Sequence, residues 1–406
     1  MTLQGKKKIL VIGPRMEIGG VERSLIGLLD NFDYSKVDVD LFLFDHHGEL
    51  LTHINPNAHL LPEQKCFSLI NYPIARLFSR GHFLIGMFRL MAMFTWWLHL
   101  KFSLGETSFS NHITLCKKWA TKLSFPLVKD YDLALGFFGP HYFLEQKVKA
   151  KNKIGWVHTD YGHANEKPDK TFILPMWAGL DYIACVSESV KGSFDAVFPE
   201  LKNKTIVIEN ILSTELVRQQ AKQEQEKVLQ EMPNDGAFRL LTVGRFSPPK
   251  NYPAAIDACK ALHDKGMNIK WYFLGYGPMD GEIKNRIHEQ NAEDYVKVLG
   301  KRENPYPYIA KCDLYVQPSL YEGKAVTVRE AQILGKPVLI TDFATASAQL
   351  EHGVDGYICP LSPEGIVSGI EFLFSHADYR NQLARTALSR DYSNLSEMDK
   401  IYQFLS

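Results

Sequence analysis

The chain lacks an excess of charge of either sign, and its cysteines follow no recognisable pattern. Its 406 residues contain 46 Lys and Arg and 46 Asp and Glu, so the formal net charge at pH 7 is zero. A neutral balance gives no electrostatic reason to expect nucleic acid as a partner. The six cysteines are scattered and form no C-x-x-C pair. They are typical of reduced packing residues and argue against a disulfide framework or a zinc site.

Several catalytic signatures are also absent. No Walker A pattern and no G-x-G-x-x-G occurs, which argues against a dinucleotide oxidoreductase. No G-x-S-x-G elbow is present, and no His, Cys and Asp cluster has metal-ligand spacing, so no metal site is predicted. The apolar run after the basic segment Met1–Lys8 is too short for a signal peptide and reads as a first strand. We expect a cytoplasmic protein.

The start of the chain has the pattern of a β-α-β unit. Ile9–Ile12 is a continuous apolar run, as expected for a parallel strand covered on both faces. Gly13–Gly20 reads as a loop, Val21–Leu29 has helical spacing, and Val37–Phe44 reads as a second strand. Further strands are predicted at Leu133–Phe137, Lys153–His158, Tyr182–Val186 and Thr205–Ile208.

The pattern restarts after a polar stretch. Residues 215–236 are rich in Gln, Glu and Lys and predict a helix that leads to an interdomain connection. Strands and helices then alternate again from Phe238–Val243 onward, which is typical of a doubly wound α/β domain. Because 406 residues exceed one typical core, we expect two such domains, 1–212 and 213–385. Residues 386–406 form a C-terminal segment in which Leu395–Leu405 predicts a short amphipathic helix that packs back on the first domain.

Residues 66–129 break this alternation. The stretch from His82 to Phe102 is long and apolar, with Arg89 near its middle. Eight Lys and Arg stand against one acid, Glu106, between residues 66 and 129, although the whole chain is neutral. Basic residues beside Trp and Phe suit an anionic membrane surface, whereas a central arginine is costly inside a bilayer. Three interpretations stay open: core helices of the first domain, a peripheral membrane or lipid-acceptor surface, and a transmembrane span.

Two carboxylates, Glu322 and Glu330, lie eight positions apart around a predicted helix start. Glu322 would stand on the loop before the helix and Glu330 about two turns inside it. A helix N-terminus offers free N–H groups and partial positive charge to a phosphate, and two carboxylates could hold hydroxyls of a sugar and a ribose. This arrangement would suit a nucleotide sugar, although ordinary solvated glutamates explain it about as well.

Glycines and basic residues follow other predicted strands. Gly19 and Gly20 follow the first strand and open a helix, where backbone N–H groups can approach a phosphate. Arg245 and Lys250 lie on a proline-stiffened loop after the first strand of the second domain and could pair with two phosphates. The alternatives are a tight turn for the glycines and surface charges for the Arg and Lys.

Three further strand ends carry weaker signals. Gly275 and Gly277 form a strand-end loop suited to close approach of a flat base, and Lys301 follows the next strand. His158 ends a strand of the first domain, and a neutral histidine there could donate to a sugar hydroxyl or stabilise developing charge. A plain turn and a structural histidine are the alternatives.

In order and spacing, this set of motifs resembles glycosyltransferase family 4, a family of retaining enzymes. The resemblance spans nearly the whole chain except residues 66–129, and it is strongest from Phe238 to Pro360. It implies the GT-B fold: an α/β protein of two Rossmann-like doubly wound domains that face a central cleft. Where the family commonly has Gly-Phe-Gly-Leu after the first glutamate, this chain has Gly323, Lys324, Ala325 and Val326.

The resemblance also implies roles for individual residues. Arg245 and Lys250 would bind the donor diphosphate, Glu322 the transferred sugar and Glu330 the ribose. Backbone groups of the segment after Glu322, including Gly323, Lys324 and Ala325, would orient sugar and phosphate. The remaining members of the expected site are Gly19 and Gly20 near the diphosphate, His158 near the sugar, and Gly275, Gly277 and Lys301 on the donor side.

The implied activity is transfer of a sugar, with retained configuration and without a metal, from a nucleotide-diphosphate sugar such as a UDP-sugar. The expected acceptor is a glycan, most simply a lipid-linked one in surface polysaccharide synthesis. The protein would work in the cytoplasm at the inner face of an anionic membrane and would need no cofactor. Two alternatives stay open: a nucleotide-sugar 2-epimerase of the same fold, and a non-catalytic glycosyltransferase-like partner protein.

Overall fold

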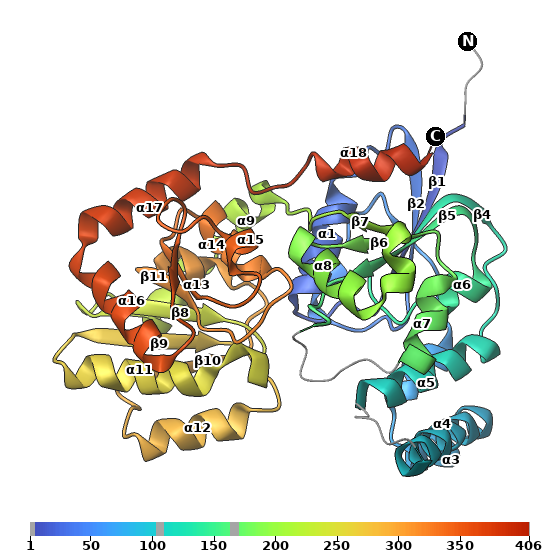
Figure 1. Ribbon diagram of the computed structural model, residues 1–406, viewed down its shortest axis with the longest axis horizontal. Helices are drawn as coiled ribbons and strands as arrows, with labels where there is room; N and C mark the ends of the chain where they lie inside the picture. Colours follow the sequence, from blue (N-terminus) through green and yellow to red (C-terminus); the bar gives the residue numbers. More distant parts are fainter. Residues whose placement is uncertain (1–4, 103–108, 163–169, 406) are drawn as a thin grey trace. The chain divides into compact units, whose positions relative to one another are not determined.

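The computed structural model describes residues 5–102, 109–162 and 170–405, so Glu106 lies outside the described residues. The chain divides into two compact units, coloured mainly blue to green and yellow to red in Figure 1. Unit 1 comprises Met1–Glu17, Val21–Ile211 and Leu395–Ser406. Unit 2 comprises Ile18–Gly20 and Leu212–Asn394. Each unit is an α/β body around one parallel sheet.

Unit 1 is built on a seven-stranded sheet with the order β3-β2-β1-β4-β5-β6-β7, and its paired strands run parallel. The strand order reverses between β1 and β4, which is the place where open α/β sheets bind ligands. The strands are β1 (Lys7–Gly13), β2 (Val37–Leu43), β3 (His59–Leu60), β4 (Asp130–Gly136), β5 (Lys149–Val157), β6 (Tyr182–Cys185) and β7 (Thr205–Val207).

The helices of unit 1 cover the sheet because its strands are apolar on both faces. In β1 the run Ile9–Val11 is fully buried, which agrees with the continuous apolar pattern of the sequence. The helices are α1 (Gly20–Asp30), α2 (Lys65–Ser68), α3 (Ile74–Ser79), α4 (Phe83–Phe102), α5 (Phe109–Leu123), α6 (Tyr142–Lys147), α7 (Lys170–Ala178), α8 (Glu188–Val197) and α18 (Glu397–Tyr402).

Unit 2 is built on a six-stranded parallel sheet with the order β10-β9-β8-β11-β12-β13. Its order again reverses, between β8 and β11. The strands are β8 (Phe238–Val243), β9 (Ile269–Leu274), β10 (Val296–Gly300), β11 (Leu314–Gln317), β12 (Val338–Thr341) and β13 (Tyr357–Cys359). The helices are α9 (Thr214–Gln220), α10 (Gln225–Glu231), α11 (Tyr252–Asp264), α12 (Asp280–Glu289), α13 (Tyr306–Lys311), α14 (Val326–Ile333), α15 (Ala346–Gln349), α16 (Pro363–Ser375) and α17 (Ala377–Ser389).

The sheet of unit 2 separates two apolar cores, and successive strand residues alternate between them. In β9, Trp271 and Phe273 face the core shared with α11, α12 and α16. Tyr272 and Leu274 face the opposite core, shared with α9, α10, α13 and α14. This period of two is the geometry of a strand, and it fixes the register because a one-residue slip would exchange the two faces.

The sequence predicted one helix over the polar stretch 215–236, and the structure shows that this prediction was wrong. The stretch contains two short helices, α9 and α10, separated at Ala221–Glu224. Glu224 has a backbone φ of 50°, a left-handed conformation that interrupts right-handed helix geometry. The interruption lets Val217 and Val228 both enter the same core.

The C-terminal residues 386–406 contain the end of α17 and a separate short helix, which lies within the predicted Leu395–Leu405. Helix α17 ends at Ser389, and the six-residue helix α18 follows only at Glu397. The segment from Leu395 belongs to unit 1. There the Tyr402 hydroxyl accepts a hydrogen bond from the Asp33 amide at 2.7 Å, and the Phe404 carbonyl accepts one from Asn152 at 2.9 Å.

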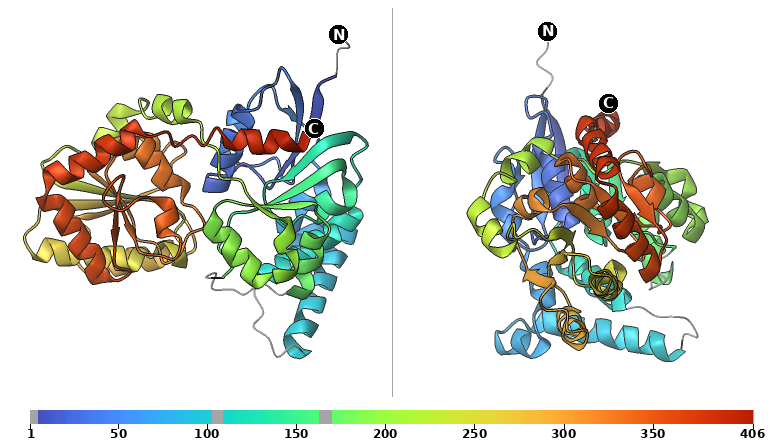
Figure 2. Two further views of the ribbon diagram at one scale, coloured as in Figure 1. Left: turned by 45° about the horizontal axis from the view of Figure 1, so that its top comes forward. Right: turned by 90° about the vertical axis from the view of Figure 1, so that its left-hand side faces the viewer.

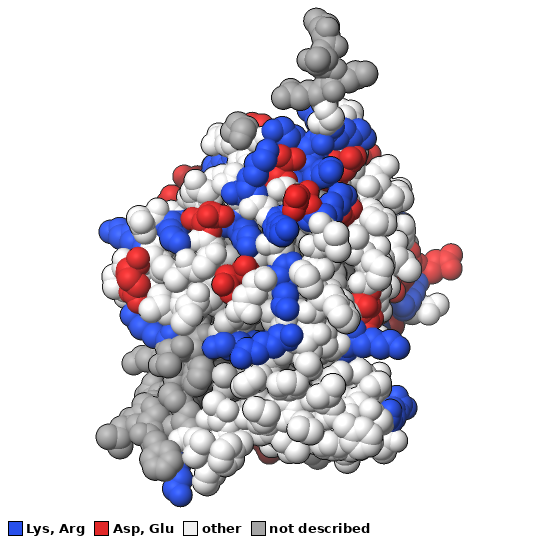
Figure 3. Space-filling model, turned by 90° about the vertical axis from the view of Figure 1, so that its right-hand side faces the viewer, with Lys and Arg blue, Asp and Glu red and all other residues white. Residues whose placement is uncertain are grey.

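The segment 66–129 divides into helices with different surroundings. Helix α5 packs against α2, α6 and α7, whereas α4 packs on α3, α5 and the turn Leu69–Asn71. Figures 1 and 2 show α3 and α4 beyond α5, at the outer end of unit 1. The lower part of the face in Figure 3, where these helices lie, is predominantly white. Within the described residues, no helix has the length and apolarity that crossing a membrane requires.

Candidate functional site

The loops that follow β8, β9 and β10 are joined through their backbones. The Gly244 amide donates to the Leu274 carbonyl at 3.0 Å, and the Gly275 amide donates to the Gly300 carbonyl at 2.9 Å. Two residues further along both loops, the Phe246 amide donates to the Tyr276 carbonyl at 2.8 Å. These bonds hold three loops together at the carboxyl edge of the sheet, the edge where ligands bind in this architecture.

Gly275 and Gly277 have a packing reason to be glycine. A Cβ atom on Gly275 would lie 1.9 Å from the Gly244 carbonyl oxygen, and one on Gly277 would lie 2.3 Å from that of Phe246. Both distances are below any real Cβ contact, so side chains there would push the loops apart. The glycines therefore allow the loop after β9 to lie close against the loop after β8. The predicted contact of Gly275 and Gly277 with a flat base stays a prediction.

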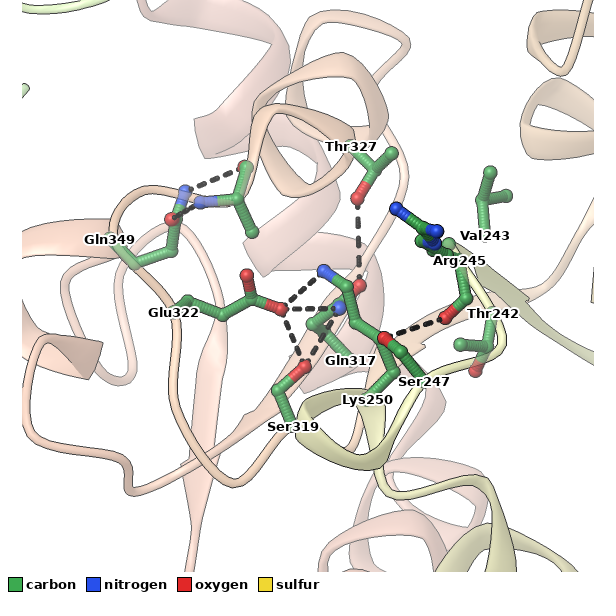
Figure 4. Close-up of polar contacts among 12 residues, drawn as sticks. Thr242, Val243, Arg245, Ser247, Lys250, Gln317, Ser319, Glu322, Thr327 and Gln349 are labelled. Carbon is green, nitrogen blue, oxygen red and sulfur yellow. Dashed lines mark hydrogen bonds and ion pairs between the residues drawn. The ribbon is translucent and has the colours of Figure 1, made fainter. Parts of the chain in front are cut away.

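The strongest polar contact of the expected site joins Lys250 and Glu322. The Lys250 ammonium lies 2.5 Å from Glu322 Oε1, and the two side chains are only 18% and 12% exposed. The same oxygen accepts hydrogen bonds from Ser319 Oγ at 2.6 Å and from Gln317 Nε2 at 2.9 Å. All three contacts use Oε1, and Oε2 points away from them in Figure 4. The arrangement fixes the carboxylate and leaves its second oxygen directed elsewhere.

Sequence reasoning missed Gln317 and Ser319. Both are fully buried polar residues at the end of β11, where the apolar strand gives way to the loop. Gln317 accepts in turn from the Tyr315 hydroxyl at 2.9 Å. The signal was present in the sequence: polar side chains directly after a buried strand fall at the edge where ligands bind.

The loop between Glu322 and α14 is held by two residues from further along the chain. Thr345 Oγ1 donates to the Glu322 carbonyl at 2.8 Å. The Gln349 side chain accepts from the Ala325 amide at 2.7 Å and donates to the Ala325 carbonyl at 3.2 Å. The backbone of Ala325 is thus engaged by Gln349, whereas Gly323 and Lys324 lie on the partly exposed part of the loop.

Glu330 lies one turn inside α14, closer to the helix start than the predicted two turns. It is 1% exposed, and its Oε1 accepts a hydrogen bond from the Tyr306 hydroxyl at 2.9 Å. Tyr306 begins α13, so the contact joins neighbouring helices on one face of the sheet. A role for Glu330 in holding a ribose stays a prediction.

Two further cations of the expected site, Arg245 and Lys301, stand on the loops after β8 and β10. Arg245 is exposed, and Figure 4 shows its side chain extending from its loop on the same side as that of Lys250. Lys301 places its ammonium 4.5 Å from the centre of the Tyr276 ring. The structure therefore gathers Lys250 and Glu322 into one network, with Arg245 on the same loop as Lys250.

In unit 1, His158 directly follows β5, as the sequence predicts. Its Nε2 donates to the Phe137 carbonyl at 2.7 Å, and burial lowers the pKa of the imidazole to about 4. At neutral pH the ring is uncharged, and Nδ1 carries the lone pair. The sequence predicted that His158 could donate to a sugar hydroxyl or stabilise developing charge. With Nε2 donating to Phe137, the second nitrogen, Nδ1, can only accept a hydrogen bond. Gly19 precedes α1 and Gly20 begins it.

Two further basic groups near His158 escaped sequence reasoning. His141 is 2% exposed, and burial lowers its pKa to about 3. Burial, followed by the charge of Arg15, lowers the pKa of the Lys117 ammonium to about 8, and its Nζ lies 3.5 Å from the Gly139 carbonyl. His141 follows the end of β4 and could have been found by its strand-end position. Lys117 comes from α5, and only the tertiary structure brings it there.

In the part of the chain that the structure describes, no three His, Cys, Asp or Glu side chains lie together as a metal site would require. The six cysteines are free thiols, and five of them are buried. Burial raises the pKa of the Cys185, Cys312 and Cys359 thiols to about 12, so these groups stay protonated and act as packing residues.

Two Rossmann-like units in one chain, each with a parallel α/β sheet, define the GT-B class of proteins, and comparison of the whole chain supports this class. The structure of Anabaena Alr3699/HepE in complex with UDP and glucose superposes with a TM-score of 0.68 at 17% identity. The alignment covers 98% of this chain and 99% of that one. The chain has the GT-B fold.

The match to a protein family lies within unit 2. Residues 223–390 match the family model described as glycosyl transferases group 1. The amylovoran biosynthesis glycosyltransferase AmsK of Erwinia amylovora is 31% identical over 131 residues, which cover 30% of this chain and 32% of AmsK.

A second relative is an enzyme of Campylobacter jejuni, N-acetylgalactosamine-N,N'-diacetylbacillosaminyl-diphospho-undecaprenol 4-alpha-N-acetylgalactosaminyltransferase. It is 31% identical over 125 residues, which cover 31% of this chain and 33% of that enzyme. In both cases the match spans about a third of the relative's length.

Proposed function

We propose that the protein is a retaining glycosyltransferase that moves a sugar from a nucleotide-diphosphate sugar, a UDP-sugar in the simplest case, to a glycan acceptor. The observation that carries the proposal is the Lys250–Glu322 pair, fixed by Ser319 and Gln317 at the carboxyl edge of the second sheet. The match of residues 223–390 to glycosyl transferases group 1 supports it. So does the likeness in fold to HepE, which was solved with UDP and glucose.

Different residues around the Lys250–Glu322 pair bind different parts of the nucleotide-sugar donor. The Lys250 ammonium has three N–H groups; one bonds Glu322, and the others remain for the diphosphate, which Arg245 also binds. Glu322 Oε2 accepts from a hydroxyl of the transferred sugar. The amides of Gly323 and Lys324 orient sugar and phosphate, and Ala325, whose backbone Gln349 holds, fixes the end of this binding segment. Glu330 holds the ribose.

Other residues of the site complete the proposal. Gly275 and Gly277 border the base, and Lys301 adds positive charge on the donor side. Gly19 and Gly20 approach the diphosphate, and His158 Nδ1 accepts from a sugar hydroxyl.

The reaction needs no protein nucleophile and no metal in this proposal. The bond between the anomeric carbon and the β-phosphate oxygen breaks, and the acceptor oxygen bonds to the same face of the anomeric carbon. The acceptor proton passes to the departing phosphate oxygen. Lys250 and Arg245 stabilise the negative charge that develops on the diphosphate, which is electrostatic catalysis by preorganised groups.

We propose that the acceptor is a lipid-linked glycan of surface polysaccharide synthesis. The enzyme, in the cytoplasm, would bind this acceptor at the inner face of an anionic membrane. The AmsK relative is named for amylovoran biosynthesis, and the name of the Campylobacter relative includes a glycan linked to diphospho-undecaprenol. Neither the family match nor these relatives favour the 2-epimerase or the non-catalytic alternative.

The first test is a panel of nucleotide sugars, assayed without acceptor for released nucleotide and by calorimetry for binding. Lys250→Ala should lower turnover roughly 100- to 1,000-fold, because it removes the ammonium group that stabilises the negative charge developing on the diphosphate. Lys260→Ala is the matched control, because Lys260 forms an exposed i,i+4 pair with Asp264 on α11 and should leave turnover unchanged. The proposal fails if no nucleoside diphosphate binds, or if Lys250→Ala and wild type turn over equally.

Once an active donor is found, two finer points have their own readouts. NMR of the product with an acceptor reports the anomeric configuration, and an inverted product would exclude the retaining mechanism. Turnover should be unchanged in EDTA, and loss of activity that Mg²⁺ or Mn²⁺ restores would exclude metal independence.

A further inference from the structure

Helix α4 presents a row of large apolar side chains to solvent. Their exposed fractions lie between 41% and 64%. The residues are Phe83, Leu84, Met87, Leu90, Met91, Met93, Phe94 and Trp97. Apart from Met93, they recur at the helical period and therefore lie along one side of the helix. A contiguous exposed apolar surface of this kind marks an interaction site.

The opposite side of α4 is the packed side, and it holds the central arginine. Gly86 and Ala92 are buried, and the Phe88 ring lies 5.4 Å from the Trp119 ring of α5. Arg89 donates a hydrogen bond from its guanidinium to the Tyr72 carbonyl. The one charge in the middle of the helix is therefore turned inward, and the exposed apolar row is continuous.

Positive charge stands beside this row. Arg76 is exposed on α3, and Arg80 is exposed directly after this helix. Lys101 is exposed near the end of α4, with its ammonium 5.1 Å from the Trp97 ring. The described residues of 66–129 include no Asp or Glu. In Figure 3 blue side chains lie at the edges of the white region. A partner that complements this surface must offer an apolar interior to the row of α4 and negative charge to the cations beside it.

We propose that α4 lies in the plane of an anionic phospholipid bilayer. Its apolar row enters the boundary between headgroups and acyl chains, and Arg76, Arg80 and Lys101 contact lipid phosphates. The 20 residues of α4 measure about 30 Å, which gives a long line of contact along the membrane. The inference deepens the proposed function, because it names the surface at which the transferase would meet a lipid-linked acceptor.

The test is co-sedimentation of the full chain with vesicles of phosphatidylcholine alone and of phosphatidylcholine with 30% phosphatidylglycerol. Wild type should bind the anionic vesicles more tightly, by about fivefold for each of the three cations that contacts the surface. Leu84→Glu combined with Phe94→Glu should weaken binding at least about tenfold, because two charges replace buried apolar area. Arg76→Gln, Arg80→Gln and Lys101→Gln together should remove the preference for anionic vesicles.

Leu229→Glu is the matched control, because Leu229 is an exposed leucine of α10, 43% exposed, outside this surface. It should bind vesicles as wild type does. Equal binding by wild type and the Leu84→Glu, Phe94→Glu variant would overturn the proposal, and so would equal binding to neutral and anionic vesicles. A concentration-dependent dimer that this variant abolishes, without vesicle binding by wild type, would assign the surface to a second copy of the chain.

Failure of this inference and failure of the proposed function are distinguishable. Release of nucleotide from the donor without acceptor needs no membrane, so the Leu84→Glu, Phe94→Glu variant should retain it in vesicle-free solution. Loss of vesicle binding with donor turnover intact supports the docking surface. Donor turnover without any vesicle binding by wild type leaves a glycosyltransferase whose α4 has another partner.

Discussion

At the scale of residues, the candidate site depends on polar groups that fix one another before any ligand arrives. Glu322 receives three hydrogen bonds on one oxygen, and Ser319 and Gln317, which supply two of them, are fully buried. Buried polar groups of this kind are costly unless they are satisfied, so the network holds a single geometry. His158 is fixed in the same way, because the Phe137 carbonyl selects its tautomer.

The buried histidine gives a pH dependence to stability. The folded pKa of His158, about 4, lies below the unfolded value of about 6.5, so its contribution is fully present above pH 6.5 and is lost as pH falls toward 4. His158→Gln keeps an amide donor for Phe137 and removes the titrating group. Between pH 6.5 and 4, the free energy of unfolding of the variant should fall less steeply than that of wild type, by about 1.4 kcal/mol per pH unit.

Urea unfolding from pH 4.5 to 7 measures this difference. His288→Gln, which replaces an exposed histidine of α12, should keep the wild-type slope. Equal slopes for wild type and His158→Gln would show that His158 is not buried as a neutral ring.

At the scale of elements, the loops of unit 2 owe their shape to backbone contacts that only glycine permits. The β9–α12 loop carries Gly275 and Gly277 against the β8–α11 loop, which carries Lys250. The strand predicted at Phe238–Val243 has the same bounds as β8, and strands and helices alternate after it as predicted. The helix expected over residues 215–236 was wrong, because a polar sequence does not show where a left-handed residue such as Glu224 ends a helix.

Gly275→Ala should be strongly destabilising, by several kcal/mol, because its Cβ would meet the Gly244 oxygen at 1.9 Å. It should also weaken donor binding, because the β8–α11 loop that it displaces carries Lys250. Gly281→Ala is the matched control: it lies in the first turn of α12 with no atom within 4 Å of its Cβ, and it should stabilise by about 0.4–1 kcal/mol. Thermal unfolding with and without UDP measures both effects, and equal behaviour of the two variants would contradict the account.

At the scale of the whole molecule, one chain builds two sheets with the same strand order. When the strands of each unit are numbered from one, both sheets have the order 3-2-1-4-5-6, and the sheet of unit 1 adds a seventh strand after the sixth. The chain leaves unit 1 at Ile211 and returns to it at Leu395. Its last helix is tied to unit 1 by the Tyr402 and Phe404 hydrogen bonds and by Ile401, which is fully buried.

Deleting residues 395–406 should therefore destabilise unit 1 and leave unit 2 unchanged. Hydrogen exchange should become faster in β1, β2 and β5, because the Asp33 and Asn152 contacts and the burial of Ile401 are lost. Tyr402→Phe, which removes one hydrogen bond, should produce a smaller effect of about 1 kcal/mol. Faster exchange in β8, β9 and β11 after the deletion would contradict this assignment of the segment.

The sequence by itself determined the two α/β units, the strand-end positions of Lys250 and His158, and the place of Glu322 on the loop before a helix. Apolar runs and helical periods are local properties, and a parallel sheet places every strand end at a known edge. Only the tertiary structure decided that Gln317 and Ser319 hold Glu322, that Lys117 comes from α5 to the end of β4, and that Arg89 turns inward on α4. These contacts join residues far apart in the chain or depend on which side of a helix is covered, and periodicity alone contains neither kind of information.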